Sequence, residues 1–258
     1  MLRKRIIFTL IYSQNQFTQS RNFRLQKVGN IDWLKKHYQL QKTSFSLDEL
    51  IVLNGTREQK NINDFANIIS QLTDSVFIPV AAGGGIRSLE DAQLLFNSGA
   101  DKIVLNSALC CDIHLVKSLL HKYGSQSIIA SIDYRIHNKL HEIYIADGSK
   151  KLDMTLINYI QHIENLGLGE VYLNSIDQDG TGFGYDFKTI EEIKDEIKIP
   201  LIIAGGAGNA KHLCDGLNIE NVSAVATANL FNFIGNGFSN ARREILDSGI
   251  NIAPWACD

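Results

Sequence analysis

The eight residues IPVAAGGG (Ile78–Gly85) return 121 positions later as IPLIIAGG (Ile199–Gly206). Each copy is a short apolar run that ends in adjacent glycines, a pattern typical of a buried strand followed by a tight turn. A repeat at about half the chain length indicates two equivalent structural units. The sequence therefore predicts two similar halves, at about residues 1–122 and 123–258.

Short apolar runs alternate with amphipathic segments along the whole chain. We expect strands at residues 5–11, 49–54, 76–82, 102–106, 127–133, 169–174, 199–204 and 222–227. We expect helices at residues 61–72, 89–98, 113–123, 154–166, 187–197 and 210–217. Strands that alternate with helices imply right-handed βαβ units and a parallel sheet. Eight such strands in 258 residues predict an α/β protein, a single (β/α)8 TIM barrel domain over residues 1–258 that is built from two half-barrels.

The composition is that of an ordinary globular protein, with 45% apolar and 21% charged residues. A formal net charge of -3 without basic runs argues against a nucleic-acid partner. The cysteines Cys110, Cys111, Cys214 and Cys257 lack C-x-x-C spacing, which favours the reducing cytosol. No small-x-small cleavage site follows the stretch 1–12, so we interpret it as a strand, and no apolar run has transmembrane length. We therefore expect a cytoplasmic protein without a membrane partner.

The repeat also aligns the first strand with the fifth. Residues 6–12 (IIFTLIY) match residues 128–134 (IIASIDY), and this alignment places Ile11 opposite Asp133. That alignment has an offset of 122, and the offset of 121 found for the glycine turns places Glu49 opposite Glu170. Two half-barrels should carry equivalent sites, so one of two equivalent acids is missing at Ile11.

The glycine turns of the repeat are candidate phosphate sites. Backbone N–H groups in such turns bind anions, and active sites of these barrels lie where the strands end. A single turn of this kind would most simply serve the backbone alone, but two turns related by the repeat favour a ligand with a phosphate at each end. The candidates at these strand ends are Gly84, Gly85, Asn106, Ser107, Asn174, Gly205, Gly206, Ala228 and Asn229.

Two aspartates are candidates for acid–base catalysis. Asp133 ends the fifth strand and Asp179 lies in the polar loop after the sixth, so both could reach the mouth of the barrel. In that loop we expect Asp177 to stabilise a turn or cap a helix instead. The histidines have no ligand spacing, and the sequence implies no metal and no cofactor.

Four charged residues stand where predicted strands begin: Arg5, Glu49, Lys102 and Glu170. Residues two apart in a strand share a face. If Asn106 and Asn174 point into the barrel, Lys102 and Glu170 do so as well. Buried charges need partners, so two acids and two bases would neutralise one another as a ring, although solvent-facing strand starts are the simpler alternative for each residue alone.

With these motifs the sequence resembles the HisF family, the cyclase subunits of imidazole glycerol phosphate synthase. The resemblance covers nearly the whole chain. Its most specific stretches are residues 4–7, 83–86, 99–102, 124–127, 175–180, 184–186 and 205–208.

The resemblance implies a (β/α)8 barrel that docks a HisH-like glutaminase on its N-terminal face. It implies that ammonia enters through a gate formed by Arg5, Glu49, Lys102 and Glu170, and that Asp101 lies at the glutaminase interface. It also implies a bis-phosphate ligand at the opposite end, where Gly180 joins the candidates given above.

The departures from the family pattern are specific. Family cyclases use two aspartates, at the ends of strands one and five; Asp133 matches the second, but Ile11 replaces the first. Gln19 stands where a substrate-handling lysine is expected, Asn54 replaces an acid, and Asn229 replaces a small hydroxyl residue. This pattern resembles the glycosyl-amidation-associated HisF-like branch. That resemblance implies ammonia delivery to a sugar amidotransferase in a surface-polysaccharide or nonulosonic-acid pathway, with the cyclase reaction weak or lost.

Two other functions stay open at this point. The chain could be an authentic cyclase of histidine biosynthesis in which Asp133 and Asp179 suffice. It could also be a phosphate-binding regulatory barrel without catalysis. A sugar-phosphate isomerase is disfavoured, because it too would need an acid on the first strand.

Overall fold

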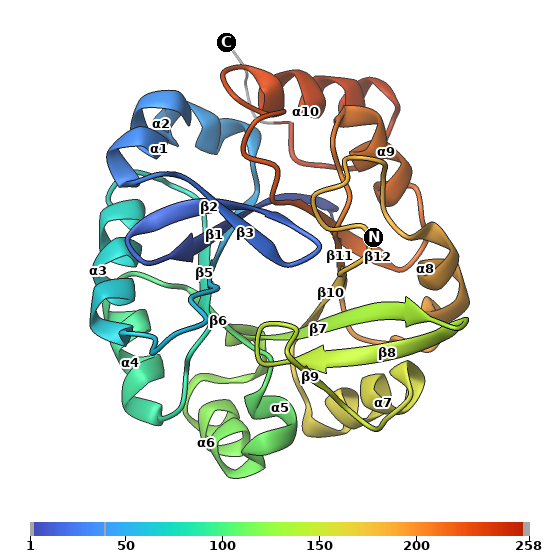
Figure 1. Cartoon of the computed structure of the whole chain (residues 1–258). Coiled ribbons are helices and arrows are strands. Elements are labelled where there is room, and N and C mark those ends of the chain that lie inside the picture. The colour runs from blue at the N-terminus through green and yellow to red at the C-terminus, as the bar shows by residue number, and fades with distance from the viewer. Residues whose placement is uncertain (1–2, 39, 255–258) are drawn as a thin grey trace.

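Eight parallel strands close into a barrel in the computed structural model, which describes residues 3–38 and 40–254 (Figure 1). The barrel strands are β1 (Arg5–Ser13), β4 (Glu49–Asn54), β5 (Val80–Gly83), β6 (Lys102–Leu105), β7 (Ile128–His137), β10 (Glu170–Ser175), β11 (Leu201–Ala204) and β12 (Val222–Thr227). The pairing of β7 with β10 completes the circle. The predicted (β/α)8 barrel is confirmed.

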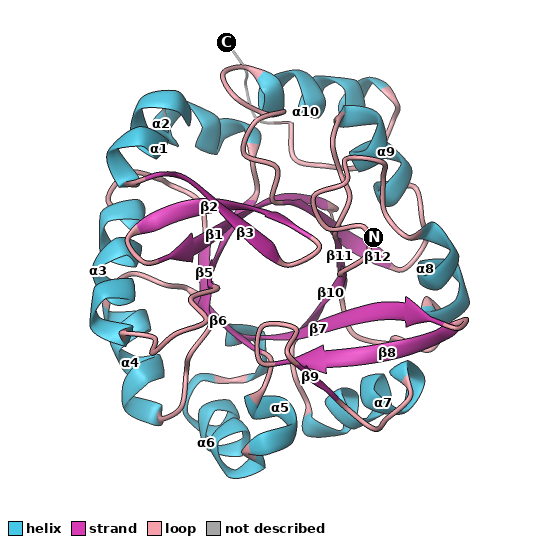
Figure 2. Ribbon diagram, viewed as in Figure 1, coloured by secondary structure: helices cyan, strands magenta, loops and turns pink. Residues whose placement is uncertain are grey.

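Helices surround this barrel (Figure 2). They are α1 (Ile31–Tyr38), α2 (Leu40–Thr43), α3 (Ile62–Thr73), α4 (Leu89–Asn97), α5 (Ala108–Cys111), α6 (Ile113–Tyr123), α7 (Leu156–Leu166), α8 (Phe187–Ile193), α9 (Ala210–Leu217) and α10 (Gly237–Asp247). Short 3-10 turns lie at Ser44–Ser46 and Ser125–Ser127. Several helices begin at side-chain caps: Ser88 and Asp91 form a reciprocal capping box at α4, and Asn61 caps α3.

Two hairpins that the sequence analysis did not predict rise from β1 and β7. Strands β2 (Gln16–Arg21) and β3 (Arg24–Gly29) follow β1, while β8 (Leu140–Ile145) and the short β9 (Lys150–Lys151) follow β7. The segment after the first strand is therefore a hairpin. Both hairpins lie across the mouth in Figure 1. The two-residue turns of these hairpins are Asn22–Phe23 and Asn138–Lys139. All four residues have positive φ angles, which Asn adopts more readily than most residues.

The predicted strands differ from the observed ones mainly at their ends. The strands predicted at 76–82 and 199–204 begin only at Val80 and Leu201, directly after Pro79 and Pro200, since proline has no N–H to donate to a ladder. β1 and β7 continue beyond the predicted ends at 11 and 133 because they pair with the hairpins. The helix predicted at 187–197 ends at Ile193. Cys257 lies outside the described residues.

Alternation along the strands divides the core into two regions. Ile6, Phe8 and Leu10 belong to the outer core, which includes side chains from the surrounding helices. A separate cluster fills the barrel interior: Ile7, Ile51, Ala81, Val104, Ile129, Tyr172, Ile202, Ala204, Ala224 and Ala226. Because every second residue points inward, Arg5 enters the interior at the end where the strands begin, which we call the floor. Ile11 enters it at the opposite end, which we call the mouth.

Candidate functional site

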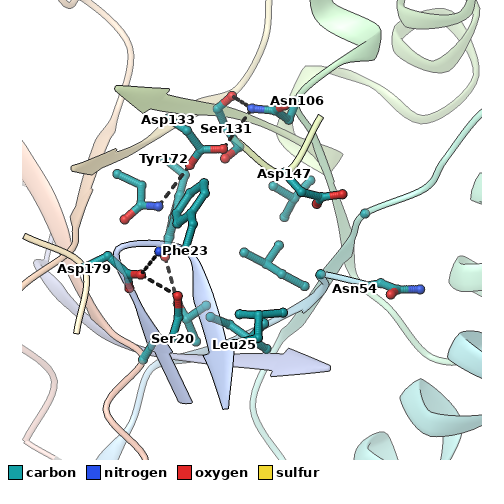
Figure 3. Close-up of a pocket in the computed structure, with 18 of the residues that line it drawn as sticks. Ser20, Phe23, Leu25, Asn54, Asn106, Ser131, Asp133, Asp147, Tyr172 and Asp179 are labelled. Carbon is teal, nitrogen blue, oxygen red and sulfur yellow. Dashed lines mark hydrogen bonds between the residues drawn. The ribbon is translucent and has the colours of Figure 1, made fainter. Parts of the chain in front are cut away.

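A cavity of about 540 Å³ opens at the mouth of the barrel. Its lining includes all the mouth residues selected from the sequence: Ile11, Gly84, Gly85, Asn106, Ser107, Asp133, Asn174, Asp179, Gly180, Gly205, Gly206, Ala228 and Asn229. These residues come from opposite halves of the chain and meet because parallel strands end on the same side. The cavity is therefore a single candidate site (Figure 3).

Asp133, on β7, is held by two amides. Asn174 Nδ2 donates to one carboxylate oxygen at 3.0 Å, and Asn106 Nδ2 donates to the other at 3.2 Å (Figure 3). Burial raises the pKa of Asp133 to about 7, against the opposing effect of the Asn174 hydrogen bond. This carboxyl can therefore gain or lose a proton near neutral pH, as a general acid or base must.

The wall of the cavity near Ile11 is apolar. A methyl group placed on Gly55 would lie 3.2 Å from Ile11 Cγ2 and 3.3 Å from Leu25 Cδ1, so these groups pack closely together. Leu53 adds another apolar side chain to the same cavity. This surface can exclude water, but it supplies no proton.

Asp179 anchors the first hairpin. Its carboxylate accepts hydrogen bonds from the Ser20 hydroxyl and from the Phe23 N–H at 3.0 Å, and its carbonyl accepts from the Asn22 N–H at 3.0 Å (Figure 3). Burial raises its pKa, although both carboxylate hydrogen bonds oppose that shift. Asp179 therefore secures the hairpin in this conformation. The sequence missed this contact because Ser20 and Asp179 are far apart along the chain.

The two glycine turns are required by close backbone packing. Gly84 has a φ of +96°, and a Cβ there would lie 2.4 Å from the Asn54 carbonyl oxygen. Gly206 has a φ of +105°, and a Cβ there would lie 2.0 Å from the Gly184 carbonyl oxygen. Packing alone accounts for both glycines, so phosphate binding at these turns stays a prediction.

The cavity is basic at one end. Among the described residues, the cations that line it are Arg57, Lys60 and Arg87, which come from the loops after β4 and β5. Lys60 Nζ lies 2.9 Å from Asp147 and donates to the Asn54 carbonyl at 2.8 Å. The sequence analysis did not select Lys60 or Asp147; the position of Lys60 directly before a predicted helix, in the segment that follows a strand, was the available signal.

At the floor, the four predicted charges form a closed network of ion pairs. Arg5 Nη1 lies 2.7 Å from Glu49, and Arg5 Nη2 pairs with Glu170. Lys102 Nζ lies 3.1 Å from Glu49 and 2.9 Å from Glu170. Each charge therefore has two opposite partners. The structure brings the four side chains together inside the barrel instead of leaving them in solvent.

Burial and ion pairing act against each other in this network. Burial raises the pKa of Glu49 by more than Lys102 and Arg5 lower it. Burial also raises the pKa of Glu170, but Arg5 and Lys102 lower it by more, so the pKa of Glu170 lies below its usual value. Because each cation contacts both acids, the network is one electrostatic unit.

A model of the family described as "Histidine biosynthesis protein" matches residues 21–235. A protein of Parasynechococcus marenigrum named "Putative imidazole glycerol phosphate synthase subunit hisF2" is 39% identical over 256 residues, covering 99% of this chain and 95% of that protein. Proteins named imidazole glycerol phosphate synthase subunit HisF are 35% identical in Pyrobaculum aerophilum, over 80% of this chain and 81% of that one, and 32% identical in an Exiguobacterium species, over 89% and 88%.

The chain belongs to the HisF family. The positions that depart from the family pattern have local partners here. Gln19 Oε1 accepts a hydrogen bond from the Leu230 N–H at 2.8 Å, and Asn229 Oδ1 accepts from the N–H groups of Phe231 and Asn232. Asn54 Oδ1 accepts from the Thr56 N–H. These side chains therefore stabilise the loops around the HisF-like mouth.

Two other predicted residues also bond to the backbone. Asp101, the expected interface residue, lies just before β6 at the floor and accepts from the Val80 N–H at 2.8 Å. Asp177 accepts from the Ile136 N–H at 2.8 Å and pairs with Arg135, so it holds the second hairpin. In residues 3–38 and 40–254 no group of three or more His, Cys, Asp or Glu side chains is arranged to hold a metal. No helix in that same part of the chain is long and apolar enough to cross a membrane.

Proposed function

We propose that this HisF-like chain is the ammonia-receiving subunit of a glutamine-dependent amidotransferase. It docks a HisH-like glutaminase, conducts ammonia through the barrel, and supports amidination of a surface-polysaccharide or nonulosonic-acid sugar by a separate amidotransferase. In this proposal the cyclase reaction is weak or lost. The partner and the class of sugar come from the resemblance to the HisF-like branch. The geometry of the mouth and the floor supports weak cyclase activity and the passage of ammonia.

The observation that carries the proposal is the inequality of the two strand ends. Asp133 has a pKa near 7 and two amide partners, whereas Ile11 lies in an apolar wall. The other acids that line the cavity are engaged: Asp179 anchors the hairpin, Asp147 pairs with Lys60, and Glu58 accepts a hydrogen bond from Gln14. Loss of one group of an acid–base pair costs a factor of about 10²–10⁴ in rate. Passage of ammonia needs no acid at Ile11.

The floor supports the ammonia part of the proposal. A network of two cations and two acids is polar enough to accept a small hydrogen-bonding molecule, and it closes the barrel where the strands begin. Phe77, which precedes β5 at the same end, is 81% exposed. An exposed aromatic ring beside a polar opening suits a protein partner on this face.

A bis-phosphate or phosphosugar is the small molecule that the mouth suits best. Gly84 and Gly85 lie beside Lys60, while Gly205 and Gly206 lie on the other half of the barrel. The first turn offers a cation as well as backbone groups, and the second offers mainly backbone groups among the described residues. We therefore expect tighter phosphate binding at the Gly84–Gly85 end.

An authentic cyclase is the second candidate, and the names of the relatives favour it. The deciding test supplies the purified chain with ammonia and the bis-phosphate substrate of the family. Robust formation of imidazole glycerol phosphate would defeat the amidation proposal. If Ile11→Asp raises a weak cyclase rate but leaves ammonia-dependent sugar amidation unchanged, the proposal stands.

The partner and the floor are tested together. Addition of a HisH-like glutaminase should give a complex whose glutaminase activity is stimulated; no stimulation would favour a regulatory phosphate-binding barrel. In that complex, Lys102→Ala should lower glutamine-dependent product formation more than product formation from free ammonia. If the Lys102→Ala variant forms product at wild-type rates from glutamine and from free ammonia, the floor network does not act as an ammonia gate.

A further inference from the structure

Tyr172 crosses the interior of the barrel. It projects inward from β10, and its hydroxyl lies 3.2 Å from the Thr9 hydroxyl on β1. Two strands, β11 and β12, separate β10 from β1 around the barrel, so the contact spans the interior instead of joining neighbours. Both side chains are buried, and Figure 3 shows the Tyr172 ring projecting toward the middle of the view.

Small residues on the intervening strands leave room for the ring. β11 contributes Ile202 and Ala204 to the interior, and β12 contributes Ala224 and Ala226. Three alanines in this region would leave a void if residue 172 were small, and protein interiors rarely keep such voids. The large residue and the small ones therefore pack together in the interior of the barrel.

This layer lies between the floor and the mouth. On β10, Glu170 of the floor network precedes Tyr172 by two residues, and Asn174 of the cavity follows it by two. Thr9 and Tyr172 line the cavity, whereas Arg5, Glu49, Lys102 and Glu170 do not. The apolar residues Ile7, Ile51 and Ile129 share the interior with the ring. The cavity therefore ends at Tyr172 and does not reach the floor.

We propose that Tyr172, held across the interior by Thr9, is an internal barrier that must move aside before a small molecule can pass from the floor network to the mouth. Where that molecule is ammonia, the inference rests on the proposed function; the barrier itself does not. Neutral ammonia can exchange hydrogen bonds with both hydroxyls, while the apolar layer disfavours a charged ion. Burial raises the pKa of Tyr172, so its hydroxyl keeps a proton to donate.

The first test follows labelled nitrogen through the complex with the glutaminase. Glutamine with a 15N amide is supplied together with excess unlabelled ammonium, and the 15N fraction of the aminated product reports passage through the barrel. Thr9→Val removes the partner of the ring but keeps its bulk, and Tyr172→Phe removes the same hydrogen bond from the other side. Loss of one hydrogen bond should speed transfer of the label about fivefold in each variant. Tyr172→Leu should speed it further.

Tyr185→Leu is the matched control. Tyr185 is equally buried and its hydroxyl donates to the Ala226 carbonyl at 3.0 Å, but its ring lies in the outer core. This variant makes the same change of size outside the interior, so the rate of label transfer should stay at the wild-type value. An equal increase in the rate of label transfer in the Tyr185→Leu and Tyr172→Leu variants would contradict the proposal that Tyr172 is a barrier.

The outcomes separate the two proposals. Label in the wild-type product and faster transfer in the Thr9 and Tyr172 variants support both. Label only in the Tyr172→Leu product supports the barrier and overturns conduction by the wild-type chain. Label at the same rate in every protein keeps conduction and removes the barrier, and label in none removes both.

A second test needs no acceptor or partner. Crystals of the free chain are exposed to xenon, which enters apolar interior space. In the wild type we expect no xenon between Tyr172 and the floor network, whereas Tyr172→Leu should admit it there. Xenon below an undisplaced Tyr172 ring in the wild type would overturn the barrier whatever the nitrogen label shows.

Discussion

The floor and the mouth of this barrel handle charge in opposite ways. At the floor, two acids and two cations stay close together, and each contacts both partners of opposite sign. At the mouth, two neutral amides donate to Asp133, and burial raises its pKa to about 7. Adjacent cations thus outweigh the effect of burial on the pKa of Glu170, whereas the neutral amides beside Asp133 do not.

The floor network therefore suits a structural role, whereas Asp133 suits proton transfer. In the floor network the cations lower the pKa of Glu170, although burial still raises that of Glu49, and the four side chains form a polar opening. An acid that titrates near neutral pH can transfer a proton but weakens the fold whenever it ionises. The following predictions test this comparison, beginning with the largest expected effect.

The largest effect concerns Asp133 and pH. Its pKa is higher in the folded chain than the usual 3.8, so the unfolded chain releases the proton first as the pH rises. The free energy of unfolding should therefore fall between pH 4 and 7 by up to about 4 kcal/mol from this group, with no further loss above pH 7.

Urea unfolding of the wild type and of Asp133→Asn over this range measures that effect, because other groups cancel in the difference. The variant should lose the Asp133 contribution and become relatively more stable as the pH rises. A difference that does not change with pH would mean that the carboxyl is ionised throughout, and the contrast with the floor would disappear.

The next effect concerns the floor. Glu170→Gln keeps the shape of the side chain but leaves Arg5 and Lys102 with Glu49 as their remaining acid in the network. Because the network is largely buried, the free energy of unfolding should fall by about 3 kcal/mol. Thermal or urea unfolding at pH 7 gives the value.

Glu192→Gln is the control for that change, since Glu192 is a half-exposed acid with a 3.9 Å contact to Lys188. Its effect should stay within about 0.5 kcal/mol. Equal losses in the two variants would show that the floor behaves like ordinary surface charge.

The smallest effect concerns the anchor of the first hairpin. Ser20→Ala removes the hydroxyl that donates to the Asp179 carboxylate and leaves the Phe23 N–H in place. We expect a loss of about 1.5 kcal/mol in the free energy of unfolding and faster hydrogen exchange in residues 16–29. Ser149→Ala, at an exposed hydroxyl, should change neither. Unchanged exchange in the Ser20 variant would mean that other contacts hold the hairpin over the mouth.

Much of this contrast could be predicted from the sequence. Alternation in 102–106 and 169–174 placed Lys102 on the face of Asn106 and Glu170 on the face of Asn174, and the structure has both pairs inside the barrel. The repeat placed Ile11 opposite Asp133, and the two residues line the same cavity. These predictions depended on two local rules, the period of a strand and the common end of parallel strands.

The first hairpin could not be predicted in the same way. Residues 13–19 are polar except for Phe17, and β2, which pairs with β1 and β3, lacks the apolar run of a barrel strand. Asp179 looked available for catalysis because nothing nearby in the chain binds it. Its partner Ser20 reaches it only after β2 folds back over the mouth.

The sequence by itself determined the barrel, the unequal strand ends at Ile11 and Asp133, and the inward side of the floor charges, because period and repeat are properties of short segments. Only the tertiary structure decided that Asp179 anchors a hairpin, that Lys60 pairs with Asp147, and that Tyr172 meets Thr9 across the interior. Each of these contacts joins strands or loops far apart in the chain. Closure of the barrel sets their distances, and no local pattern records them.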